Sequence, residues 1–310
     1  MGSSRGPLGS GRDSLQWEDR KGSPMAQQIS SSTTVTARDV IKSARGTPTS
    51  DGAGVKLTRV IGTPHVKNVG PFLMLDEFRS DEPQDYLAGF PDHPHRGFET
   101  FTYMLAGKFR HRDNKGHEGV LGPGGGQWMT AGRGIVHSEM PEQEEGLVWG
   151  FQLWINLPAS EKMKPADYRD LRPSDIPTAT LPGGATARVV SGRVGDVVGP
   201  IAERKTAPLF VEVQIPAGAE AVIPVPRGHE AFVYPFEGGV SIGERALARG
   251  ELAVLGEGDE VRLRAAGDAV RALVIAGKPL GEPVVQYGPF VMNTNEQIKE
   301  AIRDFQRGEF

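Results

Sequence analysis

Short apolar runs, each bounded by glycine or proline, constrain the fold of this chain more than any other feature of its sequence. Glycine (41) and proline (24) together make up about a fifth of the 310 residues, against about 12% in an average protein. Both residues interrupt helices and favour turns, and the apolar runs between them have the length of single strands. The pattern therefore predicts many short strands joined by turns.

This strand pattern occurs separately in each half of the chain. In the first half we expect strands at residues 33–40, 56–61, 70–79, 96–105, 118–122, 127–131 and 147–156. In the second half the candidate strands are residues 208–216, 219–226, 230–238, 239–243, 251–256, 259–265 and 269–277. Such runs are typical of antiparallel sandwiches and barrels, so we predict an all-β fold of two antiparallel β-barrel domains in tandem.

The last residues change from strand to helix periodicity. Ile298, Ile302 and Phe305 follow the spacing i, i+4, i+7, which places them on one face of a helix. Thr294 or Asn295 would cap the N-terminus of that helix. We therefore predict a short amphipathic helix at the C-terminus.

A proline-rich segment is expected to connect the two domains. Residues 158–177 contain four prolines, and residues 161–171 within them could form a short helix. We predict an N-terminal domain at 25–165 and a C-terminal domain at 166–310 that ends in the helix described above.

Residues 1–24 differ from the rest of the chain. They are rich in glycine, serine and charge and lack the apolar core of a secretory signal, so we interpret them as a disordered expression leader. Met25 is then the expected native start. Without a signal peptide the expected location is the cytoplasm, or the nucleus as well if the organism is a eukaryote.

Charge and composition exclude several classes of function. The 35 basic residues are balanced by 39 acidic ones, so no basic excess favours direct binding of nucleic acid. No apolar run reaches the ~18–20 residues that span a bilayer, so we expect no membrane insertion. Cysteine is absent, which excludes disulfides, thiolate nucleophiles and cysteine metal ligands. Any metal must be held by histidine or carboxylate.

Two clusters of histidine and acidic residues are the candidate chemistry. The first contains His93, His95 and Glu99, and the second contains His137 and Glu139. Residues i and i+2 of a strand point to the same face, so His93 and His95 project together with Glu99 in the same parity, and His137 pairs likewise with Glu139. Two such strands side by side would bring three imidazoles and one carboxylate together. That donor set suits a divalent transition metal with open positions for substrate, O2 or water.

These clusters resemble the two motifs of the cupin superfamily, and specifically those of the pirin family. The positions that carry the match are His93, His95, Glu99 and Gly107 in motif one, and Gly134 and His137 in motif two. The run 89–141 and the ending at 287–310 also look like the corresponding pirin segments. The resemblance covers nearly all of residues 35–310.

The resemblance implies a bicupin, in which two barrels face each other and only the N-terminal one holds a metal. Its ligands would be His93, His95, His137 and Glu139, whereas the usual cupin carboxylate would be Glu99. If Glu99 is not a ligand, it could instead be a buried partner of a ligand histidine or of Arg96. The expected metal is a single Fe(II), and the donor set is also compatible with Mn, Ni, Cu, Co and Zn.

The remaining histidines are not expected to bind metal. His229 is the only histidine of the second half, and one imidazole cannot build the site, so that half is expected to be structural. We interpret His65 as a turn or surface residue. His111 and His117 flank a hairpin signal at 113–116 and are expected to be exposed.

The activity associated with the pirin family is quercetin 2,3-dioxygenase. The resemblance therefore implies a metal-dependent enzyme that cleaves a flavonol such as quercetin with O2. Glu139 or Glu99 could act as the general base that removes the substrate's hydroxyl proton. A flat polyphenol needs apolar walls, and the candidates are Phe72, Met74, Phe90, Phe98, Trp128, Met129, Phe151 and Trp154.

Two other functions need the same ligands. The family also contains non-catalytic, iron-dependent regulators that bind a protein partner, either a transcription factor or a metabolic enzyme. A metal that only stabilises the fold is the third alternative, and the open positions on a six-coordinate ion disfavour it because structural sites are usually closed by protein ligands.

Overall fold

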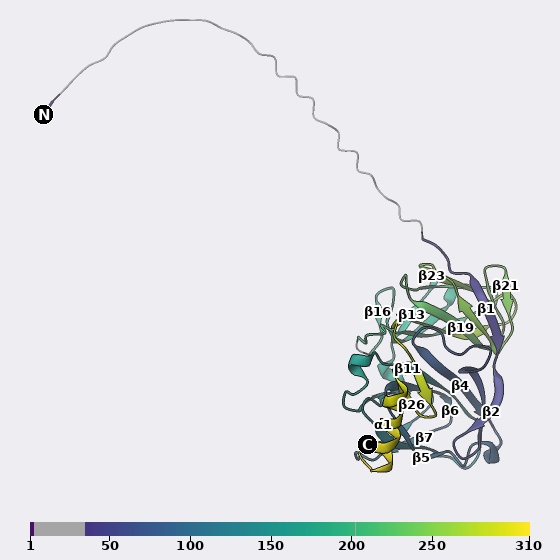
Figure 1. The fold of residues 1–310 in the computed structure, drawn as a ribbon. Helices are drawn as coiled ribbons and strands as arrows, with labels where there is room; N and C mark the ends of the chain where they lie inside the picture. Colours follow the sequence, from purple (N-terminus) through teal and green to yellow (C-terminus); the bar gives the residue numbers. More distant parts are fainter. Residues whose placement is uncertain (3–34, 202) are drawn as a thin grey trace, which may run out of the picture. The chain divides into compact units, whose positions relative to one another are not determined.

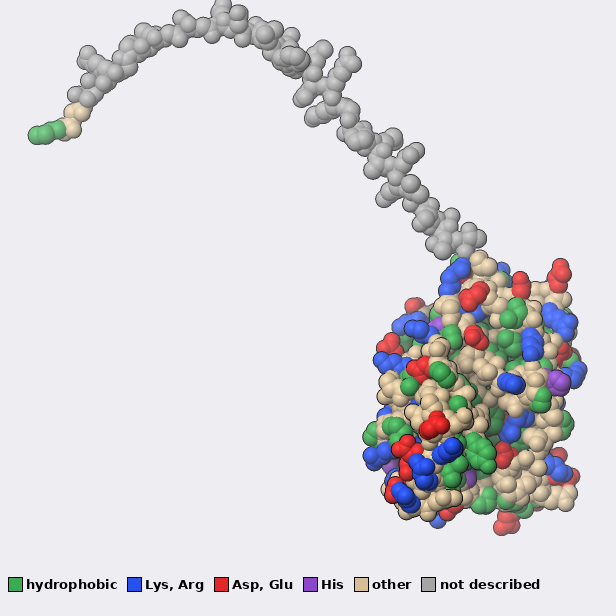
Figure 2. Space-filling model, viewed as in Figure 1, with side chains coloured by type: hydrophobic (Ala, Val, Ile, Leu, Met, Phe, Trp, Pro, Cys, Tyr) green, Lys and Arg blue, Asp and Glu red, His purple; other side chains and the backbone are tan. Residues whose placement is uncertain are grey.

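Strands dominate the described part of the chain. The computed structural model describes residues 1–2, 35–201 and 203–310 (Figure 1), and the rest of the predicted leader lies outside the described residues. Within these ranges the one α-helix is α1 (Asn295–Gln306), and no helix is long and apolar enough to cross a membrane. On the face shown in Figure 2, acidic and basic side chains are interspersed, as the nearly balanced charge leads one to expect.

The first half of the chain forms a sandwich of two antiparallel sheets. The seven-stranded sheet has the order β12-β9-β6-β11-β4-β3-β2, and the four-stranded sheet has the order β5-β10-β7-β8. The bounds in the larger sheet are β2 Thr47–Asp51, β3 Val55–Ile61, β4 Phe72–Ser80, β6 Phe98–Ala106, β9 Gly126–Thr130, β11 Val148–Asn156 and β12 Asp167–Leu171. Those in the smaller sheet are β5 Phe90–His95, β7 Phe109–Asp113, β8 Glu118–Leu121 and β10 Ile135–Pro141.

The second half repeats this arrangement. Its sheets have the orders β1-β22-β19-β24-β17-β14-β13 and β18-β23-β20-β21. The bounds in the larger sheet are β1 Val40–Arg45, β13 Thr178–Thr180, β14 Thr186–Ser191, β17 Leu209–Ile215, β19 Glu230–Glu237, β22 Glu251–Leu255 and β24 Val270–Gly277. Those in the smaller sheet are β18 Glu220–Pro224, β20 Val240–Ile242, β21 Arg245–Leu247 and β23 Glu260–Arg264.

Short elements complete the fold. Two hairpins lie outside the sandwiches, and their strands are β15 Arg193–Val194 with β16 Val197–Val198, and β25 Val285–Tyr287 with β26 Phe290–Met292. Single 3-10 turns lie at η1 Pro83–Asp85, η2 Ala159–Glu161, η3 Pro173–Asp175 and η4 Pro182–Gly184. The all-β prediction is confirmed.

The larger sheets of the two halves pack on each other. Their contact is largely aromatic, and the Phe101 and Phe210 ring centroids are 4.9 Å apart. Successive side chains of a strand point to opposite faces of its sheet. On β6, Phe101 and Tyr103 therefore face the other half, whereas Thr102 and Met104 face the interior of the first sandwich. The larger sheet of the first half therefore has one face for packing and one for a site.

The interiors of the two sandwiches differ. In the second half one continuous cluster of alanine, valine, isoleucine and leucine fills the space between the sheets, with Val211, Val233 and Val274 fully buried. In the first half several smaller clusters surround a cavity of about 620 Å³. The first half thus has interior space between its sheets of the size that ligand sites have.

One strand from each predicted domain pairs in the sandwich of the other half. β1 pairs with β22 in the second sandwich, and β12 pairs with β9 in the first. Two strands therefore lie on the far side of the predicted boundary between residues 165 and 166. The short helix expected within 161–171 does not form, because residues 167–171 of that segment join the larger sheet as β12.

The C-terminal helix is confirmed, and it packs on the first half. Thr294 is its N-cap, with the hydroxyl accepting a hydrogen bond from the Gln297 backbone N–H at 3.2 Å. Asp304 on the helix forms an ion pair of 2.7 Å with Arg96, which directly follows His95. The C-terminal segment thereby covers the end of the first sandwich at which β5 terminates.

Candidate metal centre

Two neighbouring strands of the smaller sheet bring three histidines together. β5 carries His93 and His95, and β10 carries His137 directly opposite His93. One ring nitrogen from each of the three residues lies within 4.8 Å of the others. The i, i+2 spacing on β5 puts both of its histidines on the face that looks into the cavity, as the sequence predicted. We call these residues the three-histidine cluster.

The chemistry of this cluster fits a divalent metal ion. His95 and His137 are buried, at 4% and 2% exposure, and Nδ1 of His95 and both ring nitrogens of His137 have no hydrogen-bond partner among the described residues. Buried polar atoms without partners are rare unless a ligand satisfies them. Burial, followed by the charge of His93, lowers the pKa of both residues well below 6.5. The imidazoles are therefore neutral and their lone pairs are free to bind a cation.

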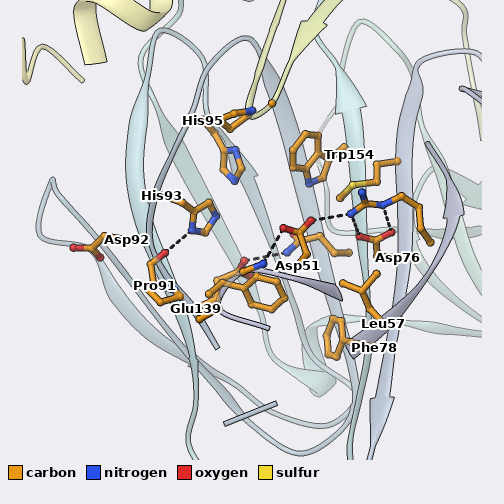
Figure 3. Close-up of a pocket in the computed structure, with 18 of the residues that line it drawn as sticks. Asp51, Leu57, Asp76, Phe78, Pro91, Asp92, His93, His95, Glu139 and Trp154 are labelled. Atoms are coloured by element: carbon orange, nitrogen blue, oxygen red, sulfur yellow. Dashed lines mark hydrogen bonds and ion pairs between the residues drawn. The ribbon is translucent and has the colours of Figure 1, made fainter. Parts of the chain in front are cut away.

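His93 is held in one orientation by its own strand. Its Nδ1 lies 2.9 Å from the carbonyl oxygen of Pro91 (Figure 3). A carbonyl can only accept a hydrogen bond, so Nδ1 carries the proton. The lone pair of Nε2 is then free to bind a metal ion. This fixes which nitrogen of His93 is available to a metal.

Glu139 lies in the same cavity, two residues beyond His137 on β10. It is 3% exposed, and its carboxylate accepts hydrogen bonds from Thr102 Oγ1 at 3.2 Å and from Gln152 Nε2 at 3.0 Å. Thr102 and Gln152 come from β6 and β11 of the opposing sheet. The carboxylate is not part of the group of donor atoms that lie within 4.8 Å of each other, but it faces the cavity beside His93 and His95.

The expectation that Glu99 shares a face with the histidines is wrong. Gly97, with φ of 89°, turns the chain from β5 in the smaller sheet to β6 in the larger one. The alternation of side chains along β5 therefore does not continue into β6. Glu99 projects from the other face of β6, where it accepts a hydrogen bond of 2.7 Å from Thr130 and pairs with Arg204 and Lys164 at 3.4 and 3.6 Å. Its carboxylate is neither in the cavity nor a partner of Arg96.

Most of the apolar residues proposed as cavity walls lie elsewhere. Met74, Phe90 and Trp154 line the cavity, together with Leu57 and Phe78. Phe98 stands behind Trp154, with ring centroids 4.3 Å apart. The other four are buried in hydrophobic cores, where alternation along their strands has placed Phe72, Trp128, Met129 and Phe151.

His111 is not exposed, contrary to the prediction. Residues 109, 111 and 113 of β7 point inward, and His111 is 2% exposed, with Nε2 lying 2.6 Å from Gln127 Nε2. His117 follows the prediction, since 58% of its side chain is exposed. His229 directly precedes β19 and does not line the cavity. The absence of metal from the second half stays a prediction.

Comparisons with known proteins place this chain in a family. The pirin family model matches residues 54–155, and the model of the pirin C-terminal cupin domain matches residues 210–310. The chain belongs to the pirin family. A pirin-like protein of Caulobacter vibrioides is 51% identical over 274 residues, which cover 88% of this chain and 99% of that protein. Human pirin is 45% identical over 264 residues, which cover 83% of this chain and 88% of human pirin.

A solved structure agrees with this assignment. The crystal structure of a quercetin 2,3-dioxygenase from Acinetobacter baumannii has a TM-score of 0.82 and 34% identity, and the match covers 89% of this chain and 99% of that one. The pirin resemblance and the cupin-like fold predicted from the sequence are therefore confirmed.

Proposed function

We propose that the protein is a metal-dependent dioxygenase that cleaves a flavonol such as quercetin with O2, and that the metal is Fe(II). The observation that carries this proposal is the position of the three-histidine cluster at the wall of a cavity of about 620 Å³. A cavity of that size holds a drug-sized aromatic molecule. The name of the Acinetobacter relative supports the same reaction.

His93, His95 and His137 would hold the metal, with Glu139 as the proposed fourth ligand. When bound, the metal supplies a positive charge and open positions at which a phenolic oxygen and O2 can be brought together. Mn, Ni, Cu, Co and Zn fit the same donor set, so the choice of iron is part of the proposal.

The other cavity residues position the substrate and its proton. Met74, Phe78 and Trp154 form apolar walls on which a flat ring can lie while water is excluded. The Glu139 carboxylate can accept the proton of the substrate's hydroxyl group, and Gln152 holds that carboxylate toward the cavity. Metal coordination and proton acceptance compete for the lone pairs of Glu139.

Replacing Gln152 by leucine tests whether Glu139 is a ligand. Gln152 donates to Glu139 Oε2 at 3.0 Å, and loss of a partner that orients a metal ligand typically weakens metal binding about 10–100-fold. We expect that loss in a competition titration with a chelator. Gln286→Leu is the matched control, because Gln286 lines the cavity without a hydrogen bond to Glu139 among the described contacts. Unchanged metal affinity in Gln152→Leu would remove Glu139 from the ligand set.

The proposed reaction is tested by isotope labelling. Quercetin is incubated with the iron-loaded protein under ¹⁸O2, and the products are analysed by mass spectrometry. A dioxygenase places both labelled atoms in the products. Absence of product at full iron occupancy would contradict the proposal and favour the non-catalytic regulator that binds a protein partner.

A further inference from the structure

A charged group in the cavity wall has no role in holding the metal. Arg59 on β3 lies beside Asp76 on β4, and Asp51 ends β2, so all three come from the larger sheet. All three line the same cavity as His93 and His95, which come from the smaller sheet. In Figure 3 the labelled carboxylate of Asp76 lies across the view from His93 and His95, and that of Asp51 lies between them and Asp76. We call these three residues the remote ion-pair cluster.

Two carboxylates fix the guanidinium of Arg59. Its Nε and Nη2 donate to the two oxygens of Asp76 at 2.9 and 2.7 Å, and Nη2 also donates to Asp51 at 2.8 Å. Asp76 is 2% exposed, and the apolar Leu57 and Phe78 line the same cavity. A well-packed apolar group at such a position would serve the fold as well as a buried ion pair does. The cluster therefore calls for an explanation beyond stability.

The cluster has unused hydrogen-bonding capacity. Nη1 of Arg59 makes no hydrogen bond within the described ranges, and 26% of the Arg59 side chain is exposed. Asp51 accepts from Gly52 and Arg59 at 2.8 Å each, and a carboxylate can accept about four hydrogen bonds. One donor and one acceptor are thus available side by side.

This combination favours a hydroxyl group over an anionic group. A hydroxyl both donates and accepts, so it can satisfy Asp51 and Arg59 together. The cluster holds two carboxylates and one guanidinium, and Glu139 and Asp92 also line the cavity. A substrate carboxylate or phosphate would face like charges that Arg59 alone does not offset.

We infer that Arg59 and Asp51 recognise a hydroxyl group at the end of the substrate remote from the metal, and that Asp76 is the positioning residue for Arg59. The inference rests on the proposed function and narrows it: the site selects neutral aromatic compounds that carry hydroxyl groups at both ends. Flavonols whose pendant ring is hydroxylated belong to this class.

The test compares two flavonols that differ only in the hydroxyl groups of the pendant ring, which is the end that the inference places at Arg59 and Asp51. Quercetin has two hydroxyl groups on its pendant ring, and galangin has none there. Dissociation constants are measured on the iron-loaded protein under anaerobic conditions, by quenching of tryptophan fluorescence, since Trp154 lines the cavity. A hydrogen bond to a charged group predicts that the wild type binds quercetin about 10–100-fold more tightly than galangin.

Three variants separate recognition from folding. Asp51→Ala removes a half-exposed carboxylate and should bring the quercetin-to-galangin ratio close to one without weakening galangin. Arg59→Met alone would leave the buried Asp76 carboxylate without a partner, so it is combined with Asp76→Leu. The double variant is expected to lose the discrimination between quercetin and galangin in the same way. Arg79→Met is the control, because Arg79 is exposed on β4 and does not line the cavity.

The outcomes distinguish this inference from the proposed function. Equal binding of both flavonols by the wild type, or discrimination that survives in both Asp51→Ala and the double variant, would overturn the inference alone. Failure of the iron-loaded wild type to bind either flavonol would overturn the proposed function, and the inference with it.

Discussion

The His95→Ala variant is expected to lose stoichiometric metal and to stay folded. His95 supplies one of only three imidazoles in the cluster, so its loss should weaken metal binding by more than the 10–100-fold typical of an outer partner. The His95 ring contacts Phe98 and Trp154 in the first sandwich, whereas the core of the second sandwich and the core between the two halves are made of other residues. We therefore expect the metal-free variant to lose only about 1–2 kcal/mol of unfolding free energy. Metal per chain is measured by elemental mass spectrometry, and folding by thermal denaturation.

His229→Ala is the matched control for this experiment. It removes the only histidine of the second half and should leave the metal content unchanged. Loss of half the metal in this variant would show a second site in the second half. Full metal retention in His95→Ala would mean that the three-histidine cluster is not the metal site.

Replacing Lys162 by methionine is expected to cost about 3 kcal/mol of unfolding free energy or more. Lys162 is 1% exposed, and its ammonium donates to the Gly97 carbonyl at 2.7 Å, to Asn156 Oδ1 at 2.6 Å and to the Val291 carbonyl at 2.9 Å. Each buried acceptor left without a donor costs about 1–3 kcal/mol. Chemical denaturation of the metal-free protein measures the change.

Lys162 connects three segments of the chain. Its three acceptors belong to the turn after His95, to β11 and to β26, so it ties the C-terminal segment to the metal centre. Lys299→Met, an exposed change on α1, should stay within about 0.5 kcal/mol of the wild type. A loss below about 1 kcal/mol in Lys162→Met would show that these hydrogen bonds are not important for stability.

The same variant should respond to pH. Burial lowers the pKa of Lys162 from 10.5 to about 8. Between these values the unfolded chain holds a proton that the folded protein has released, so the free energy of unfolding of the wild type rises with pH across this window. Lys162→Met lacks this contribution. The difference in stability between the two proteins should therefore be larger near pH 10 than near pH 7.5, and a constant difference would contradict the assigned pKa.

Local spacing predicted the features of this protein that depend on one strand at a time. The i, i+2 rule placed His93 and His95 on one face of β5, and the i, i+4, i+7 spacing found α1 with its N-cap at Thr294. Spacing also singled out His137 with Glu139, and the pirin resemblance supported their convergence with His93 and His95. The pairing of β5 with β10 joins segments about 40 residues apart and cannot be derived from either strand alone.

The errors arose where the chain changes sheets or where both faces of a strand are buried. Glu99 has the odd numbering of His93 and His95, but Gly97 turns the chain into another sheet. Glycine is required at position 97, because a Cβ there would lie only 2.0 Å from the Val291 carbonyl oxygen. His111 lies next to a hairpin turn, yet it points into the sandwich. The sequence does not predict that Arg59 lines the cavity, because a single arginine in a strand has no distinctive spacing or motif. Its role depends on Asp51 and Asp76 from the neighbouring strands.

O2 consumption tests the central claim most directly. Uptake is measured with an oxygen electrode after quercetin is added to the iron-reconstituted protein, to the metal-free protein and to the His95→Ala variant. The account predicts uptake by the reconstituted wild type alone. No uptake by a wild type whose iron occupancy has been confirmed, or equal uptake by all three samples, would contradict it.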